Sequence, residues 1–73
     1  MLAAVITCSD RAAAGIYPDR SGPLLLEALN GLGFETRGPR VVPDNLVMIR
    51  AAIREAVASG ARVVLTTGGT GVG

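Results

Sequence analysis

The apolar residues of this chain fall into three short runs that alternate with two stretches of helical periodicity. We expect strands over Leu2–Cys8, Phe34–Val42 and Arg62–Thr67. The first and third carry consecutive rather than alternating apolar residues, a pattern typical of parallel strands that are covered on both faces. The order strand–helix–strand–helix–strand, with short connections, therefore predicts an α/β fold: a three-layer parallel (βαβαβ) sheet with flanking helices and right-handed crossovers.

The two helical stretches have residues suited to starting a helix. After a polar loop from Ser9 to Asp19, Ser21-Gly22-Pro23 opens the first helix, since proline fits the first turn. Asp44 is the expected N-cap of the second. Apolar stripes at helical spacing are Leu25, Leu29 and Leu32 on the first helix and Leu46, Ile49, Ile53 and Val57 on the second. Glu55 is expected on the side opposite the second stripe, and Pro39 places the second strand at an edge or in a bulge.

Composition narrows the class of protein. The chain has 73 residues, 49% of them hydrophobic, with one cysteine and no histidine, which excludes an intrachain disulfide and histidine-based acid/base chemistry within it. Seven arginines and six acidic residues give a net charge of +1. They are scattered singly, so no nucleic-acid partner is expected. The apolar start, Leu2 to Ile6, is too short for a signal peptide or a membrane span, so we expect a soluble cytoplasmic protein.

Three strands and two helices leave part of the predicted sheet bare. Two helices cannot cover both faces of the first and third strands and also protect every edge. We therefore expect residues 1–73 to be the N-terminal portion of a single domain, nearer the common domain size of about 100–150 residues.

A glycine-rich segment follows the third predicted strand. Gly68-Gly69-Thr70-Gly71 can turn successive backbone N–H groups toward one point and hold a phosphate, with hydroxyl donors from Thr67 or Thr70. A tight turn is the alternative, although one turn seldom needs three glycines. The segment is not a Walker P-loop, because the chain has no lysine, and it is not a complete GxGxxG fingerprint.

Three chemically distinctive segments follow the ends of the three predicted strands: Ser9-Asp10, Pro43-Asp44 and Gly68–Gly71. In a parallel sheet these ends share one edge, where ligands bind. Asp44 is a candidate for holding Mg²⁺ or orienting a nucleophile, a role compatible with helix capping. Asp10 either binds a ligand or makes an Asx turn, and Ser21 and Gly22 either donate to a phosphate or only start their helix.

Two further residues are interpreted as structural. Cys8 ends a buried strand with no histidine to activate it, so a small core side chain is expected rather than a nucleophile. Tyr17 stands in a loop with no aromatic neighbour, and we expect it to be a packing or rim residue rather than a stacking platform.

Several of these segments together resemble the MogA/MoaB family of molybdenum-cofactor biosynthesis. The matching residues are Val5 to Arg11, Gly15 to Pro23, Val41 to Asp44 and Leu65 to Gly71, in the family's order and at its intervals. The resemblance covers essentially the whole chain. Each piece alone is weak, but the set is specific.

The resemblance implies molybdopterin adenylyl transfer with Mg²⁺ and ATP. Asp44 matches the family's catalytic aspartate and is the implied Mg²⁺ ligand. The phosphate-binding loop of the family matches Gly68, Gly69, Thr70 and Gly71. Ser9 and Asp10 match its loop after the first strand, and Ser21 and Gly22 match its glycine–proline helix start. The family pattern continues to a second functional aspartate in an Arg-Asp segment and to a C-terminal half, so the 73-residue chain alone is expected to be inactive. Family relatives assemble as trimers or hexamers.

Two other functions remain open at this point. A non-catalytic pterin- or nucleotide-binding module would carry the same segments without the second aspartate. A Rossmann-type oxidoreductase domain is the less favoured alternative, because its glycine fingerprint normally follows the first strand of the unit, whereas here the glycines follow the third.

Overall fold

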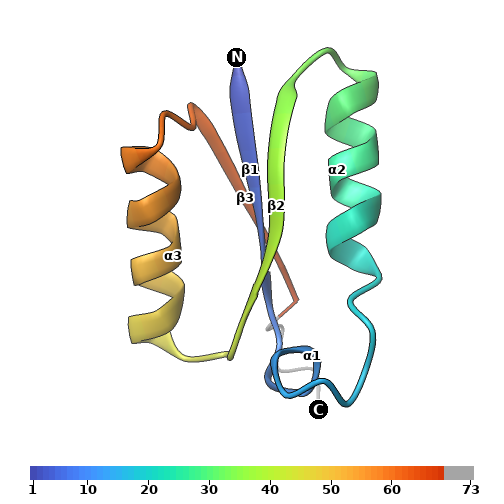
Figure 1. The fold of residues 1–73 in the computed structure, drawn as a ribbon, viewed down its shortest axis with the longest axis vertical. Coiled ribbons are helices and arrows are strands. Elements are labelled where there is room, and N and C mark those ends of the chain that lie inside the picture. Colours follow the sequence, from blue (N-terminus) through green and yellow to red (C-terminus); the bar gives the residue numbers. More distant parts are fainter. Residues whose placement is uncertain (69–73) are drawn as a thin grey trace.

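The computed structural model describes residues 1–68 as a parallel three-stranded sheet between two helices (Figure 1). The strands β1 (Leu2–Cys8), β2 (Glu35–Val42) and β3 (Val63–Gly68) are arranged in the order β2-β1-β3. Helices α2 (Ser21–Gly31) and α3 (Leu46–Ala58) lie on opposite sides of this sheet. The predicted three-layer parallel α/β fold is confirmed.

The central strand β1 is the core of the molecule, because it is buried on both faces from Ala3 to Cys8. Its side chains alternate between two apolar clusters. One contains Ala3, Val5 and Leu29 of α2; the other contains Ile6, Cys8, Val42 and Ala52 of α3. The continuous apolar run of β1 therefore packs against a helix on each face of the sheet, as predicted.

The edge strand β2 contains the irregularity that Pro39 predicts. Ala4 of β1 pairs with Arg37 and Ile6 pairs with Arg40, so β2 accommodates one extra residue between these pairs. Gly38 lies within this bulge at a φ of +105°, and a β-carbon there would come within 2.6 Å of the Val5 carbonyl oxygen. Glycine is required at this point of the bulge, and the predicted edge position or bulge is confirmed in both respects.

Two predictions about local structure are wrong. The N-cap of α3 is Asn45, not Asp44: the Asn45 side chain accepts hydrogen bonds from the backbone N–H groups of Val47 (2.9 Å) and Met48 (3.3 Å). Asparagine caps as well as aspartate does, so the sequence pattern did not separate the two neighbours. The predicted loop from Ser9 to Asp19 contains a one-turn helix, α1 (Asp10–Ala13), capped by the Ser9 side chain.

The apolar stripes of the helices are narrower than predicted. Ile49 and Ile53 pack against the core, whereas Leu46 and Val57 are exposed. The α3 contact is centred on the small residue Ala52, which is fully buried, so residues at the margins of the stripe do not reach the sheet. In α2, Leu25 and Leu29 pack inward but Leu32 is exposed.

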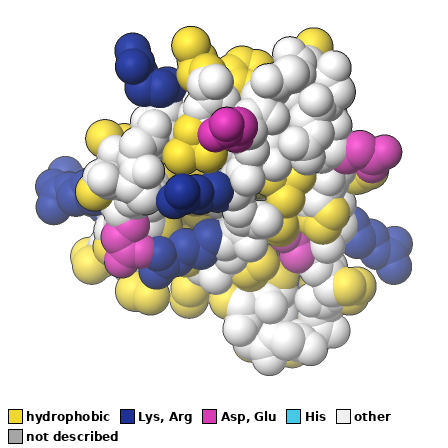
Figure 2. Space-filling view, turned by 45° about the horizontal axis from the view of Figure 1, so that its top comes forward, with side chains coloured by type: hydrophobic (Ala, Val, Ile, Leu, Met, Phe, Trp, Pro, Cys, Tyr) yellow, Lys and Arg dark blue, Asp and Glu magenta, His cyan; other side chains and the backbone are white. Residues whose placement is uncertain are grey.

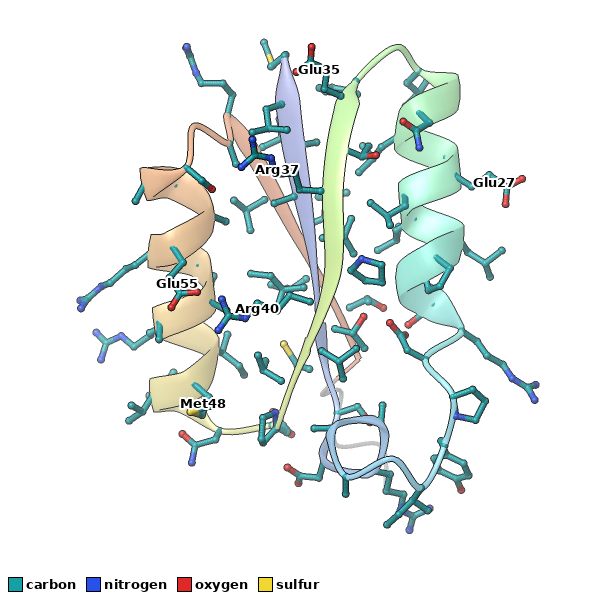
Figure 3. All side chains as sticks on the ribbon, viewed as in Figure 1. Glu27, Glu35, Arg37, Arg40, Met48 and Glu55 are labelled. Carbon is teal, nitrogen blue, oxygen red and sulfur yellow. The ribbon has the colours of Figure 1, made fainter. Side chains whose placement is uncertain are left out.

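The predicted orientation of Glu55 is also wrong. Its carboxylate forms an ion pair with the Arg40 guanidinium on β2 (Figure 3). A long side chain beside the apolar contact can extend along the sheet edge while its charged end stays in water. The carboxylate of Glu27 on α2 instead points away from the molecule.

Charged side chains are distributed over the surface rather than concentrated. On the face drawn in Figure 2, arginines are interspersed with acidic and apolar side chains. Within residues 1–68, none of the helices has the length and apolar character needed to cross a bilayer.

Candidate functional site

An open cavity of about 480 Å³ lies at the carboxyl ends of β1 and β3, beside the N-terminus of α2. Its lining is mostly polar or small: Thr7, Ser9, Ala12, Tyr17, Pro18, Asp19, Arg20, Ser21 and Gly68. The strand order β2-β1-β3 places the connection through α2 on one face and the connection through α3 on the other. The chain first adds β2 on one side of β1 and then returns to add β3 on the other side. The strand order therefore reverses between β1 and β3, and parallel α/β sheets bind ligands at such a point.

The corners after β1 and β2 meet at this edge of the sheet. The Ser9 backbone N–H donates to the Val42 carbonyl oxygen at 2.9 Å. The Asp44 backbone N–H donates to the Asp10 carboxylate, also at 2.9 Å. Residues 34 positions apart are thereby tied together, and the convergence predicted for the Ser9-Asp10 and Pro43-Asp44 segments is present in the structure.

Thr7 and Asp19, which line the cavity, are linked by hydrogen bonds to each other and to Gly22 at the start of α2. The Thr7 hydroxyl donates to one oxygen of the Asp19 carboxylate at 2.8 Å, and the Gly22 backbone N–H donates to the other at 3.1 Å. Thr7 is only 3% exposed, so this carboxylate supplies the hydrogen-bond partner that a buried hydroxyl requires. Asp19 thus fixes the start of α2 against the end of β1.

The predicted site residues occupy different places around the cavity. Ser9, Ser21 and Gly68 line it. Asp10 and Asp44 are joined to each other at the neighbouring corner, both exposed. Gly22 is buried in the first turn of α2 and is not part of the cavity lining, and Thr67 lies on β3 directly opposite Thr7. Gly69, Thr70 and Gly71 lie outside the described residues.

The structure adds residues that the sequence analysis did not assign to a site: Thr7, Tyr17, Asp19 and Arg20. One signal for Thr7 was present, because it is a hydroxyl side chain at the end of an otherwise apolar strand. Asp19 gave no comparable signal, since an acidic residue near a helix start is explained by the helix dipole alone.

Gly68 is required by the close approach of β3 to β1. Its φ is +80°, and a β-carbon there would lie 2.6 Å from the Cys8 carbonyl oxygen. The first glycine of the predicted phosphate loop therefore has a structural reason to be glycine at the point where the strand reaches the cavity.

Cys8, the residue before Ser9, is a free thiol that is buried in the core. Burial, and secondarily the negative charge of Asp44, raise the pKa of the Cys8 thiol. Its exposed fraction is 4%. Both causes act against the thiolate, which is the nucleophilic form.

We expect iodoacetamide to alkylate Cys8 in the folded chain at least about tenfold more slowly than in the urea-unfolded chain. Because the folded state holds the thiol proton more tightly, its stability should fall as the pH rises from the ordinary thiol pKa through the raised pKa of Cys8. Mass spectrometry of alkylated chain across this pH range measures the first effect, and urea midpoints measure the second. Equal alkylation rates in the two states would contradict the burial of Cys8.

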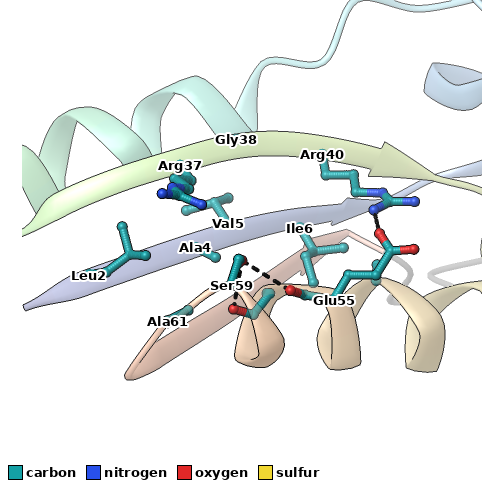
Figure 4. A pocket seen from close by; sticks show the side chains of 12 residues that line it. Leu2, Ala4, Val5, Ile6, Arg37, Gly38, Arg40, Glu55, Ser59 and Ala61 are labelled. Carbon is teal, nitrogen blue, oxygen red and sulfur yellow. Dashed lines mark hydrogen bonds and ion pairs between the residues drawn. The ribbon is translucent and has the colours of Figure 1, made fainter.

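A second cavity, of about 310 Å³, lies between α3 and the sheet (Figure 4). Aliphatic side chains such as Leu2, Ile6 and Ala56 dominate its lining, and the charged groups at its rim include the paired Arg40 and Glu55. It extends toward the amino ends of the strands, and the hydroxyl in its lining, that of Ser59, already donates to the carbonyl oxygens of Glu55 and Ala56 at 3.0 Å. The cavity at the carboxyl ends is therefore the candidate functional site.

The fold and this site define a class of protein. It is a parallel α/β domain with an open cavity at the carboxyl ends of β1 and β3, surrounded by hydroxyl groups and a close glycine backbone. Such cavities suit small ligands that carry phosphate.

The family model described as "Probable molybdopterin binding domain" matches residues 4–73. The chain belongs to this family, and the resemblance found in its sequence is confirmed.

Individual relatives agree with this assignment. The chain is 50% identical over 68 residues to the molybdopterin adenylyltransferase of Pyrococcus furiosus, covering 93% of this chain and 40% of that protein. It is 38% identical over 71 residues to the molybdopterin adenylyltransferase of Escherichia coli, covering 92% and 36%. The chain thus spans less than half the length of these relatives.

Solved structures show the same fold. The tungsten cofactor synthesizing protein MoaB from Pyrococcus furiosus superimposes with a TM-score of 0.90 at 46% identity, covering 99% of this chain and 44% of that one. A molybdopterin biosynthesis protein from Mycobacterium abscessus gives a TM-score of 0.89 at 42% identity, covering 99% and 45%.

Proposed function

We propose that this chain is the N-terminal portion of a molybdopterin adenylyltransferase and carries the phosphate-binding side of its active site. The observation that carries the proposal is the cavity at the carboxyl ends of β1 and β3, where Ser9 after β1, Ser21 at the start of α2 and Gly68 at the end of β3 come together. Its volume of about 480 Å³ is within the range of small-molecule sites. Family membership and the names of the relatives support molybdopterin as the ligand.

The proposed reaction joins two phosphates. An oxygen of the molybdopterin terminal phosphate attacks the α-phosphorus of ATP, a new P–O–P bond forms, and the bond to the β-phosphate breaks. Pyrophosphate leaves with the bonding electrons, and adenylyl-molybdopterin is the product. Such a reaction depends on positioning the two phosphates and on neutralising the charge that develops between them.

Each residue of the site has a proposed role. The hydroxyls of Ser9 and Ser21 donate to phosphate oxygens from two sides of the cavity, and Gly68 brings the β3 backbone to its edge. Gly69, Thr70 and Gly71 continue the phosphate loop, with Thr67 as a further hydroxyl donor. Gly22 contributes through Asp19, to which its N–H is bonded, by fixing the start of α2.

Asp44 is the proposed catalytic residue and a proposed ligand of Mg²⁺. Mg²⁺ is usually bound by one or two carboxylates together with substrate phosphates. Asp44 and Asp10 supply two exposed carboxylates at one corner. Within residues 1–68 no three acidic, cysteine or histidine side chains gather around one point, so the remaining ligands would come from phosphates and water. The ion would offset negative charge on the reacting phosphates.

The assembled protein is proposed to be a cytoplasmic homo-oligomer, a trimer or hexamer. The exposed apolar side chains of Leu46, Val47 and Val57 on α3 are available for contacts with other parts of the protein or with another subunit. The partners of the site are molybdopterin and ATP, with neither nucleic acid nor membrane involved.

The decisive experiment uses the full-length protein that contains this chain. Incubation with molybdopterin and Mg-ATP should yield adenylylated pterin and pyrophosphate in equal amounts, and chromatography of the pterin with a coupled pyrophosphate assay measures both. Tight binding of molybdopterin without either product would favour the binding module instead.

A further inference from the structure

Tyr17 occupies a position in the structure that its sequence context did not predict. It is 53% exposed, as expected of a rim residue, but it lines the cavity at the carboxyl ends of the strands. Ala12 and Pro18 also line the cavity and, with the Tyr17 ring, supply its apolar lining, whereas Ser9, Ser21 and Gly68 supply hydroxyl and backbone groups.

Three contacts from Arg11 hold Tyr17 in place. The Arg11 guanidinium donates to the Tyr17 hydroxyl at 2.8 Å, and its central carbon lies 5.4 Å from the centroid of the Tyr17 ring. The Arg11 carbonyl oxygen accepts from the backbone N–H groups of Ile16 (2.8 Å) and Tyr17 (3.4 Å). Both the ring and its backbone are therefore fixed before any ligand arrives, which lowers the entropy cost of binding against the ring.

A fixed, half-exposed aromatic ring beside hydrogen-bond donors for phosphate suits a ligand that carries both a flat ring and a phosphate. Flat heteroaromatic rings stack on aromatic side chains with little dependence on which ring they are. Both ligands of the proposed reaction contain such a ring joined to phosphate: the pterin of molybdopterin and the adenine of ATP. The phosphate would lie toward Ser9, Ser21 and Gly68, and the ring toward Tyr17.

We propose that Tyr17 is a positioning residue that stacks against the fused nitrogen heteroaromatic ring of the ligand bound in this cavity. The inference rests on the proposed function for the presence of phosphate beside the ring. It adds the residue that recognises the ring and the role of Arg11, which fixes that residue.

The test uses the full-length protein that contains this chain, with its tyrosines selectively labelled for NMR. The Tyr17 ring-proton resonances are those that the Tyr17→Phe variant lacks. Titration with ATP should shift them upfield if adenine is the stacked ring, and titration with the phosphate ester of 6-hydroxymethylpterin should shift them upfield if the stacked ring is pterin. Tripolyphosphate, which has no ring, should not shift them upfield.

Variants separate stacking from a structural role. In calorimetric titrations, Tyr17→Leu should weaken binding of the ring-containing ligand by about fivefold to a hundredfold and leave tripolyphosphate binding unchanged. Tyr17→Phe, which keeps the ring and loses the bond to Arg11, should remain within about threefold of the original affinity. Ile16→Ala, an exposed neighbour outside the cavity lining, is the matched control and should change nothing.

The outcomes distinguish this inference from the proposed function. If all ligands perturb the resonances of Ser21 and Gly68 but none perturbs Tyr17, the stacking role is overturned and the phosphate site stands. The stacking role is likewise overturned if Tyr17→Leu weakens tripolyphosphate binding as much as it weakens binding of the ring ligands. If no ligand perturbs Ser21, Gly68 or Tyr17, both proposals are overturned.

Discussion

Replacing Gly22 by alanine is expected to lower the free energy of unfolding by about 2–3 kcal/mol, although alanine is the better helix former. A β-carbon at this position would lie 2.6 Å from both the Thr7 hydroxyl oxygen and the Pro39 β-carbon, and it would also collide with the Asp19 carboxylate. These groups belong to β1, to β2 and to the loop before α2, and two of them, Thr7 and Asp19, are hydrogen bonded to each other. Relief of the collision would therefore separate α2 from β1 and break that bond.

The size of this effect is large for a chain of 73 residues, because small domains have total stabilities of only about 0.05–0.15 kcal/mol per residue. Gly31→Ala is the matched control in the same helix. A β-carbon at Gly31 would meet nothing within 4 Å, so this variant should keep or raise stability by up to about 1 kcal/mol. Urea unfolding followed by circular dichroism measures both variants. Equal stabilities for the two would show that the tight contact at Gly22 is absent in solution.

The arrangement of the fold could be predicted from the sequence because its strongest signals are periodic. The continuous apolar run of β1 predicts burial on both faces, and both faces are occupied, by α2 and α3. Pro39 predicts an edge or bulge because it lacks a backbone donor, and β2 has both features. These rules depend on a residue and its near neighbours, so one sequence is enough to apply them.

The features that were missed depend on contacts between distant segments. Asp19 meets Thr7 across 12 positions, and this pair has no signature in local spacing. The approach of the Asp10 and Asp44 segments was predicted, but the hydrogen bond from the Asp44 backbone to the Asp10 carboxylate was not. The predicted N-cap of α3 was Asp44 and the observed one is Asn45. The two residues cap helices almost equally well, so only the backbone geometry decides between them. Glu55 was placed on the solvent side because its partner Arg40 belongs to another element.

The edge of the sheet where the strands end has one feature that the sequence predicts and one that only the structure shows. The parallel order of the strands follows from the sequence pattern, and with it the expectation that Ser9, Asp44 and Gly68 lie at one edge. The structure adds a distinction within that set: Ser9 and Gly68 line the cavity, while Asp44 lies at the adjoining corner with Asp10. This separation fits a site in which hydroxyl and glycine groups hold the phosphates and the carboxylates act at their margin.

Asp44→Asn, introduced into the full-length protein that contains this chain, is expected to reduce the rate of adenylyl-molybdopterin formation by about a hundredfold or more. A hundredfold corresponds to about 2.7 kcal/mol of transition-state stabilisation. The fold should be unaffected, because the Asp44 side chain is exposed and the hydrogen bond from this residue to Asp10 uses its backbone N–H, which asparagine keeps.

A second measurement reports on Asp44 independently of activity. Its charge is one of the two causes that raise the pKa of Cys8, so Asp44→Asn should lower that pKa toward the ordinary thiol value while burial keeps part of the shift. Glu27→Gln removes an equally exposed carboxylate that points away from the molecule on α2, and it should alter neither product formation nor the Cys8 titration. Suppose that Asp44→Asn lowers the pKa of Cys8 but leaves product formation unchanged. Asp44 would then lie near Cys8, as in the structure, but would have no part in the mechanism.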